Sequence, residues 1–304
     1  MENEKLIVEE RIFQGKKIVY VTNGVVELCV GKDFGPRIFR FNLVGKENVF
    51  FNDDESFVST ENKYHHYGGH RLWHTPEVAG VTNIPENDPV SVTVEEDTVV
   101  IAQLTSDIPL KRRISFKLNG NTVTLLHELT NEGPFAVETS CWAITQMKPN
   151  GYAVMPTSTL PTGLHPNRQF VVWPYTDMQD ARMAILNRYV TVQLDSSVQK
   201  TFKIGTNNDA GFAAFFTQDG QMFVKKFIYD EEGAYVDYGA SYEIYNCADF
   251  LEMETLSPAA LLQPGETLEH YEEWSLEDGV TAPDPKDEAA LFALFKEKGL
   301  EIEW

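Results

Sequence analysis

The chain has 304 residues, long enough for one large domain, and its apolar content of 42% can fill a sizeable core. Its net charge of −21, from 25 basic and 46 acidic residues, repels phosphate backbones and anionic membrane surfaces, so neither nucleic acid nor membrane partners are expected. Three cysteines lie far apart, at Cys29, Cys141 and Cys247, which argues against a disulfide framework and for a reducing compartment.

Two further absences predict a cytoplasmic protein. The first five residues lack the basic start and apolar run of a secretory signal. No apolar segment approaches the roughly 18 residues that cross a bilayer. We therefore expect a monomer or a homodimer that acts on a small molecule.

Most of the chain predicts short strands joined by turns. Residues 18–30 are rich in Val, Ile and Tyr around an Asn23-Gly24 turn, and later hairpins turn at Asn119-Gly120 and Asp219-Gly220. Residues 52–62 and 150–169 are expected to be connections, and residues 177–186 to hold one short helix. Further strands are expected at residues 37–43, 90–94, 99–104, 114–118, 123–125, 138–147, 189–194, 212–216, 222–227, 235–238, 242–245, 250–256 and 268–276.

The last segment of the chain has a different pattern. Asp284-Pro285 is a helix-start signal, and Leu291, Phe292 and Phe295 recur at helical spacing before Gly299. Strands every 8 to 12 residues with almost no helices favour an all-β fold, a large antiparallel β-sandwich. We expect one sandwich domain over residues 1–280, with a helical tail, residues 281–304, packed on it.

Residues 65–77 concentrate polar and aromatic side chains around a Gly-Gly pair. His66, His70, Arg71, Trp73 and His74 lie within nine residues of one another. Burying so many polar groups in a core strand is costly, which favours a pocket that hydrogen-bonds a polar ligand and gives it a flat apolar face. The glycines would let that ligand approach the main chain. The alternative is an ordinary polar loop.

Residues 250–258 form an expected strand with two carboxylates on one face. Alternation places Leu251 and Met253 toward the core and Glu252 and Glu254 on the opposite face, about 6.6 Å apart. Like charges at this distance raise a pKa when water is scarce, and a raised carboxylate can act as a general base. The alternative is a solvated acidic face, paired with Lys225 or Lys226.

Other candidates carry weaker signals. Trp142 and Trp173 could stack on a sugar ring or belong to the core. Asp237 and Glu243 lie in Tyr-rich segments and are either pocket acids or surface charges. His127, in a Leu-rich strand, fits a hydrogen-bonded core histidine.

No spacing predicts a metal ion or a cofactor. A metal site from His65, His66, His70 and Glu77 can be imagined, but it matches no known zinc or calcium pattern. No phosphate-binding glycine loop, nucleophile elbow or dinucleotide fingerprint occurs.

Several short motifs, in order over residues 15–276, resemble the galactose mutarotase-like superfamily, the aldose 1-epimerase group in the broad sense. More closely, the chain is similar to an uncharacterised branch of that superfamily. The motifs are Gly35-Pro36-Arg37-Ile38, Gly68-Gly69-His70-Arg71-Leu72-Trp73 with Pro76-Glu77, Leu129-Thr130-Asn131, Glu252-Met253-Glu254-Thr255-Leu256-Ser257-Pro258 and Leu262-Gln263-Pro264-Gly265-Glu266.

The resemblance implies a supersandwich with a sugar pocket on its concave face. In the family a glutamate on a late strand removes the anomeric hydroxyl proton, a histidine protonates the ring oxygen, and the ring opens and recloses. Glu254 matches the family base. The family histidine before the glycines is Tyr67 here, and residues 138–143 lack the second histidine, so His70 or His66 would take over the acid role.

The sequence thus favours an aldose 1-epimerase-like isomerase with Glu254 as base and His70 as acid. His66, Arg71, Trp73, His74, Trp142, Glu252, Lys225 and Asp237 would bind the sugar. A non-catalytic carbohydrate-binding protein is the second hypothesis. A glycoside hydrolase is the third, because Glu252 and Glu254 have a compatible separation but project from one strand.

Overall fold

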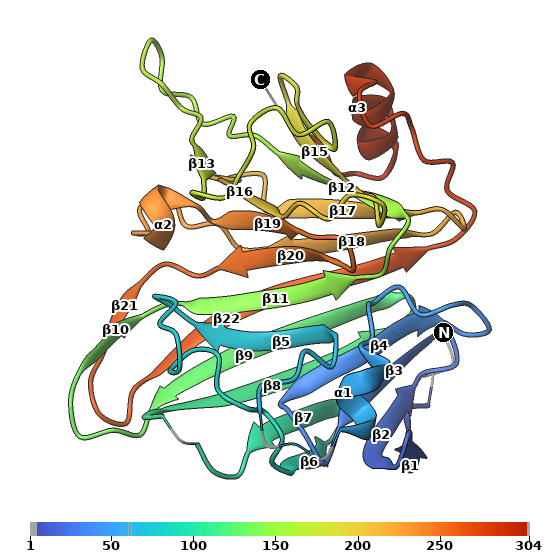
Figure 1. Ribbon diagram of the computed structural model, residues 1–304, viewed down its shortest axis with the longest axis vertical. Helices are drawn as coiled ribbons and strands as arrows, with labels where there is room; N and C mark the ends of the chain where they lie inside the picture. Colours follow the sequence, from blue (N-terminus) through green and yellow to red (C-terminus); the bar gives the residue numbers. More distant parts are fainter. Residues whose placement is uncertain (1–4, 60, 62, 107, 303–304) are drawn as a thin grey trace.

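The computed structural model describes residues 5–59, 61, 63–106 and 108–302. Within them, two ten-stranded antiparallel sheets lie face to face, joined at one end by the small pair β10 (Val137–Thr139) and β21 (Ala260–Leu262) (Figure 1). The first sheet has the order β1 (Ile7–Phe13), β2 (Lys16–Thr22), β3 (Val26–Gly31), β4 (Arg37–Leu43), β5 (Gly69–His74), β11 (Cys141–Met147), β20 (Leu251–Leu256), β19 (Tyr242–Asn246), β16 (Phe202–Thr206) and β13 (Phe170–Val172). The second has the order β14 (Met183–Ile185), β15 (Tyr189–Leu194), β12 (Gly151–Pro156), β17 (Phe212–Thr217), β18 (Met222–Phe227), β22 (Thr267–Glu277), β9 (Thr122–Asn131), β8 (Leu110–Asn119), β7 (Thr98–Gln103) and β6 (Val90–Glu95). The expected all-β antiparallel sandwich is confirmed.

The main core fills the space between the sheets. Alternate residues of each strand point inward, as with Leu251 and Met253 of β20 and Phe223 of β18. These inward side chains bury the apolar area that stabilises the fold. No helix of the described residues is long and apolar enough to cross a membrane.

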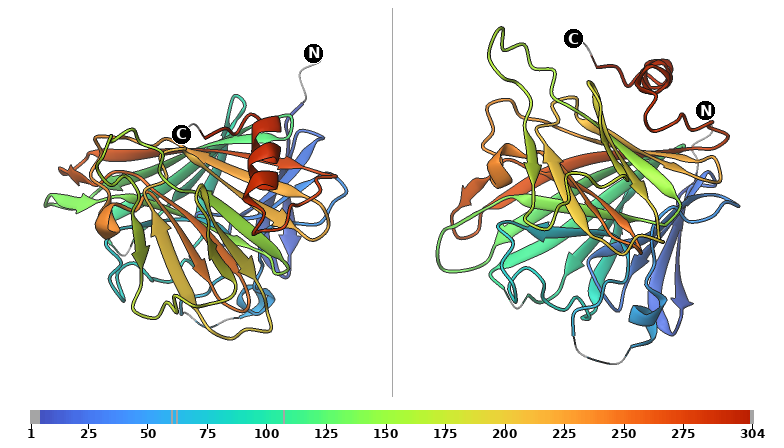
Figure 2. Two further views of the ribbon diagram at one scale, coloured as in Figure 1. Left: turned by 90° about the horizontal axis from the view of Figure 1, so that it is seen from above. Right: turned by 45° about the horizontal axis from the view of Figure 1, so that its top comes forward.

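The second sheet is also buried on part of its outer face. Helix α3 (Glu288–Glu297), capped by Asp287 rather than begun at Pro285, packs Leu291 and Phe295 against Phe212 and Phe216 of β17 (Figure 2). Because both faces of β17 are covered, its sequence is a continuous apolar run rather than an alternating one.

Four local predictions are wrong. Residues 177–186 contain β14 instead of a helix, and residues 150–169 begin with β12 instead of being entirely a connection. Residues 235–238 lie in a short turn of helix, α2 (Val236–Gly239), where Asp237 and Tyr238 adopt left-handed backbone angles. Another short helix, α1 (Asp54–Val58), interrupts the expected loop over residues 52–62.

The histidine-rich stretch is the largest surprise. Gly69–His74 is β5, a central strand with every residue buried, between β4 and β11. The Gly-Gly pair fits close to its own chain rather than to a ligand. A Cβ on Gly68 would collide with the carbonyl of Phe51, and a Cβ on Gly69 with the backbone of β4.

Helix α3 should contribute measurably to stability. Phe295 is fully buried and contacts the rings of Tyr189, Phe212 and Phe216. We expect Phe295→Ala to lower the free energy of unfolding by about 3–5 kcal/mol, because it leaves a cavity under the helix. Phe292→Ala, on the half-buried side of the same helix, should cost less. Urea denaturation measures both, and equal losses would contradict this packing.

Candidate functional site

The outward face of the first sheet carries a group of charged side chains at its centre. Cross-strand partners point to the same side of a sheet, so register places these side chains together. One row of partners is Arg71, Ile144, Glu254 and Glu243, and the next is Gln146, Glu252, Tyr245 and Lys203. The rows cross β5, β11, β20, β19 and β16, which lie together in Figure 1.

A pocket with a volume of about 500 Å³ opens above these rows. Its size is in the range of small-molecule sites. Strands supply the floor, and Tyr64, His66, Glu77, Asn83 and Tyr175 lie around it. The lining residues are Tyr64, His66, Arg71, Trp73, Glu77, Asn83, Trp142, Tyr175, Thr201, Lys203, Tyr245, Phe250, Glu252 and Glu254.

Glu254 is the most enclosed carboxylate of this pocket. Its Oε2 accepts hydrogen bonds from Trp142 Nε1 at 2.6 Å and Lys203 Nζ at 2.8 Å, whereas its Oε1 has no protein partner. Burial raises the pKa of Glu254, and Lys203 only partly offsets this effect. The carboxyl is thus fixed on one side and can accept a proton on the other.

Glu252 is the acceptor at the centre of a second group of hydrogen bonds on the pocket floor. Its Oε1 accepts hydrogen bonds from Arg71 Nη2 at 3.0 Å and Gln146 Nε2 at 2.9 Å. The Arg71 guanidinium also lies 4.2 Å from the ring centroid of Trp73, which fixes the orientation of both groups.

Several buried polar atoms of the floor have no partner in the protein. They include Nε and Nη1 of Arg71, Nε1 of Trp73, Oε1 of Gln146 and Oε1 of Glu254. Leaving such atoms unpaired costs about 1–3 kcal/mol each, so a ligand or water has to complete them. A molecule with several hydroxyl groups can satisfy this mixture of donors and acceptors.

A buried network of ion pairs holds in place the loop from which Glu77 and Asn83 reach the pocket. The Glu86 carboxylate lies 2.6 Å from Arg37 Nη2 and 2.7 Å from Arg112 Nη1. Arg37 also donates to the carbonyl of Gly68. Pairing to two guanidiniums lowers the pKa of Glu86 despite its burial, so the network stays charged.

The structure brings most of the predicted site residues together. His66, Arg71, Trp73, Trp142, Glu252 and Glu254 all line this pocket. The predicted faces of residues 250–256 are also correct, although Glu252 and Glu254 pair with Arg71 and Lys203 rather than with Lys225 or Lys226.

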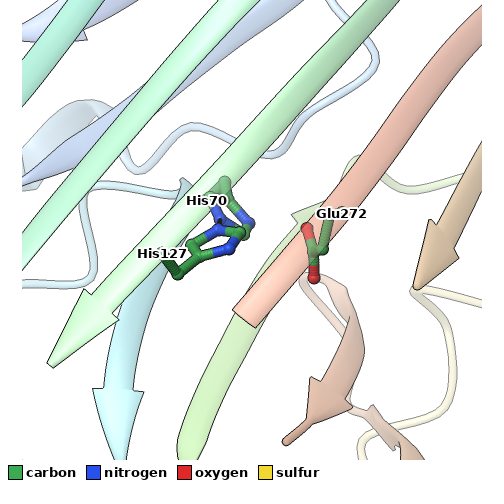
Figure 3. Close-up of side chains that lie close together, drawn as sticks. All are labelled: His70, His127 and Glu272. Atoms are coloured by element: carbon green, nitrogen blue, oxygen red, sulfur yellow. Dashed lines mark hydrogen bonds between the residues drawn. The ribbon is translucent and has the colours of Figure 1, made fainter. Parts of the chain in front are cut away.

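His70 does not belong to the pocket, and its predicted place as the acid there is wrong. Because β5 alternates, Arg71 and Trp73 face the pocket, while His70 points between the sheets. There its Nε2 lies 2.7 Å from His127 Nε2 (Figure 3). Its Nδ1 lies 2.9 Å from Thr145 Oγ1. Burial lowers the pKa of His70 well below its usual value, so the ring is neutral.

His74, Lys225 and Asp237 also lie outside the pocket. His74 shares the inward face of β5, and burial lowers its pKa to about 4. Asp237 lies on the exposed turn α2. Lys225 of β18 points inward, and its ammonium contacts four oxygens at 2.9–3.0 Å, those of Ala143 O, Thr145 Oγ1, Met253 O and Glu272 Oε1.

Among the described residues, His70, His127 and Glu272 lie close together and are of residue types that can bind a metal ion (Figure 3). Their surroundings favour a hydrogen-bonded network instead. The two imidazoles form a direct hydrogen bond with each other. The charge of Glu272 is already balanced by the Lys225 ammonium, which would repel a second cation.

Sequence reasoning missed Lys203, which lies on β16 at the edge of the pocket floor. A weak signal was present, because Lys203 is a lone cation between Phe202 and Ile204. Its ammonium lies 4.6 Å from the ring centroids of both Trp142 and Trp173.

The buried pair Lys225–Glu272 predicts a large difference between neighbouring lysines. We expect Lys225→Met to cost about 3–5 kcal/mol, because it leaves Glu272 buried without a cation. Lys226→Met, the next residue, loses only an exposed pair with Glu273 and should cost about 1 kcal/mol or less. Urea denaturation measures both, and Lys225→Met/Glu272→Gln should recover part of the loss. Equal costs for the two lysines would contradict the network.

Comparisons with known proteins identify which known fold the chain has. No protein-family model matches the chain, and no curated protein matches its sequence. Among solved structures, a galactose mutarotase-like protein from Clostridium acetobutylicum superposes with a TM-score of 0.58 at 12% identity, over 91% of this chain and 100% of that one. A galactose mutarotase-like protein from Lactobacillus casei gives 0.57 at 10% identity, over 86% and 100%. A protein from Escherichia coli, provisionally described as an aldose 1-epimerase, gives 0.58 at 11% identity, over 90% and 100%. The chain therefore has the galactose mutarotase-like fold.

Proposed function

We propose that this protein binds a free monosaccharide in the pocket above β5, β11 and β20 and interconverts its anomers, as an aldose 1-epimerase-like isomerase. The observation that carries the proposal is the Glu254 carboxyl, buried at the pocket floor with Oε1 free to accept a proton. The names of the structural neighbours support a carbohydrate substrate.

The floor offers the parts that ring opening needs. Glu254 Oε1 would take the proton of the anomeric hydroxyl, and the bond from the anomeric carbon to the ring oxygen would break. Lys203, whose ammonium lies beside Glu254, would donate a proton to the ring oxygen in place of the family histidine. Trp73 and Trp142 line the pocket, although both are largely buried, and would give the sugar an apolar surface.

A non-catalytic sugar-binding protein is the second candidate. Burial alone would lower the pKa of Lys203, but its two carboxylate neighbours raise it above the usual value, and a weak acid is a poor proton donor. A hydrolase is less well supported, because Glu252 and Glu254 lie side by side on one strand instead of on opposite sides of a substrate.

Glu254→Gln should separate catalysis from binding. The amide keeps the shape of the side chain but cannot accept the anomeric proton, so we expect the rate of anomer exchange to fall by about 10²–10⁴. NMR exchange spectroscopy on a panel of aldoses measures this rate, and calorimetry measures sugar binding.

Glu269→Gln, on the exposed part of β22, is the control and should keep the full rate. A full rate in Glu254→Gln would overturn the isomerase. Binding by the native protein without any acceleration would select the binding protein instead.

A further inference from the structure

One ammonium lies between two buried carboxyls at the edge of the pocket floor. Lys203 Nζ is 2.6 Å from Glu243 Oε2 and 2.8 Å from Glu254 Oε2. The two glutamates are direct cross-strand partners on β19 and β20, so their side chains start within about 5.5 Å of each other. Both have no exposed surface, and Lys203 is 5% exposed.

The charges of this cluster do not balance if both carboxyls are ionised. Lys203 supplies one positive charge against two negative ones, and the nearby Asp237 on α2 adds a further negative field. Arg71 does not compensate, because it is already paired with Glu252. Two like charges in a closed site raise the pKa of one of them, so the cluster is neutral when it holds one extra proton.

The surroundings favour Glu243 as the carboxyl that holds this proton. Glu254 accepts a hydrogen bond from Trp142 Nε1 as well as from Lys203, which stabilises its ionised form. Glu243 has no such neutral donor: Oε1 and Oε2 both lack a hydrogen-bond partner in the protein, and Oε2 has only the ion pair with Lys203. Burial raises the pKa of Glu243 to about 8, in the same direction as the geometry indicates.

The backbone also keeps Glu243 in place. Its partner on β16 is Gly205, and a Cβ there would lie 3.2 Å from Glu243 Cγ. The missing side chain gives Glu243 the room to lie over β16 and reach Lys203. Glu243 does not line the pocket, so it can act on a ligand only through Lys203.

We propose that Glu243 and Glu254 share one proton around Lys203, and that Glu243 is a positioning residue that restores the proton Lys203 gives away. The second part rests on the proposed isomerase. In ring opening, Glu254 takes the anomeric hydroxyl proton, the carbonyl forms, and the bond to the ring oxygen breaks. The ring oxygen takes a proton from Lys203 Nζ, and the neutral amine takes the proton of the Glu243 carboxyl. Ring closure returns each proton along the same route.

Infrared titration tests the shared proton without any turnover. Un-ionised carboxyls absorb apart from carboxylates, and ordinary glutamates have ionised by about pH 6. The native protein should keep the band of one un-ionised carboxyl at about pH 6.5 and lose it by about pH 9.5. Glu243→Gln should lack this band, whereas Glu273→Gln, at the exposed pair with Lys226, should keep it.

Glu254→Gln gives a second, independent reading of the same cluster. With one carboxylate gone, Lys203 balances Glu243 alone, so the band should disappear at a lower pH than in the native protein. Absence of the band from the native protein, or its persistence in Glu243→Gln, would overturn the shared proton. If Glu243→Gln does not fold, the native protein and Glu254→Gln still decide.

Kinetics test the supporting role of Glu243. The rate of anomer exchange should fall above about pH 8 in the native protein, because ionised Glu243 cannot resupply Lys203. Glu243→Gln should lower kcat about tenfold or more, leave KM nearly unchanged and lose this alkaline fall. An unchanged kcat and pH profile would contradict the role. No acceleration by the native protein would reject the isomerase, while the infrared result would still stand.

Discussion

The pairing of buried charges across neighbouring strands is the constraint on which the site depends. Lys203 on β16 reaches across to Glu243 on β19 and Glu254 on β20, and Arg71 on β5 reaches Glu252 on β20. A buried charge without a partner costs several kcal/mol, so these pairs hold only if the strand register is kept. A slip by one residue would turn every one of these groups to the other face.

The first sheet therefore carries two different polar systems on its two faces. The outward face holds the pocket, with unpaired hydrogen-bonding atoms that suit a hydroxylated ligand. The inward face presents His70, which contacts His127 beside the Lys225–Glu272 pair of the second sheet. Lys225 donates to the carbonyls of Ala143 and Met253, which precede Ile144 and Glu254. The interior network thus supports β11 and β20, and β20 carries the proposed base Glu254.

Local signals in the sequence predicted much of the fold. The Asn-Gly and Asp-Gly turns marked their hairpins, and alternation in residues 250–256 gave the faces of Glu252 and Glu254 correctly. Strand β5 was not recognised, because six buried residues that include two histidines and an arginine resemble a polar loop. Its polar groups are tolerated because each face supplies partners from distant strands, such as Glu252 and His127. His70 is only one residue from Arg71, but alternation along β5 turns it to the other face, where His127 is its partner.

Lys203 shows a second limit of sequence reasoning. A single lysine in a short apolar strand resembles an ordinary outward-facing residue, and only the sheet order brings it beside Glu243 and Glu254. Solved structures at 10–12% identity share the fold, so the architecture persists at low sequence identity.

The most direct test of this account is a crystal structure of the protein soaked with a mixture of monosaccharides. We predict one sugar in the pocket above β5, β11 and β20, with its anomeric hydroxyl within hydrogen-bonding distance of Glu254 Oε1 and its ring oxygen beside Lys203. A sugar bound at another surface, or an empty pocket at saturating sugar, would contradict it.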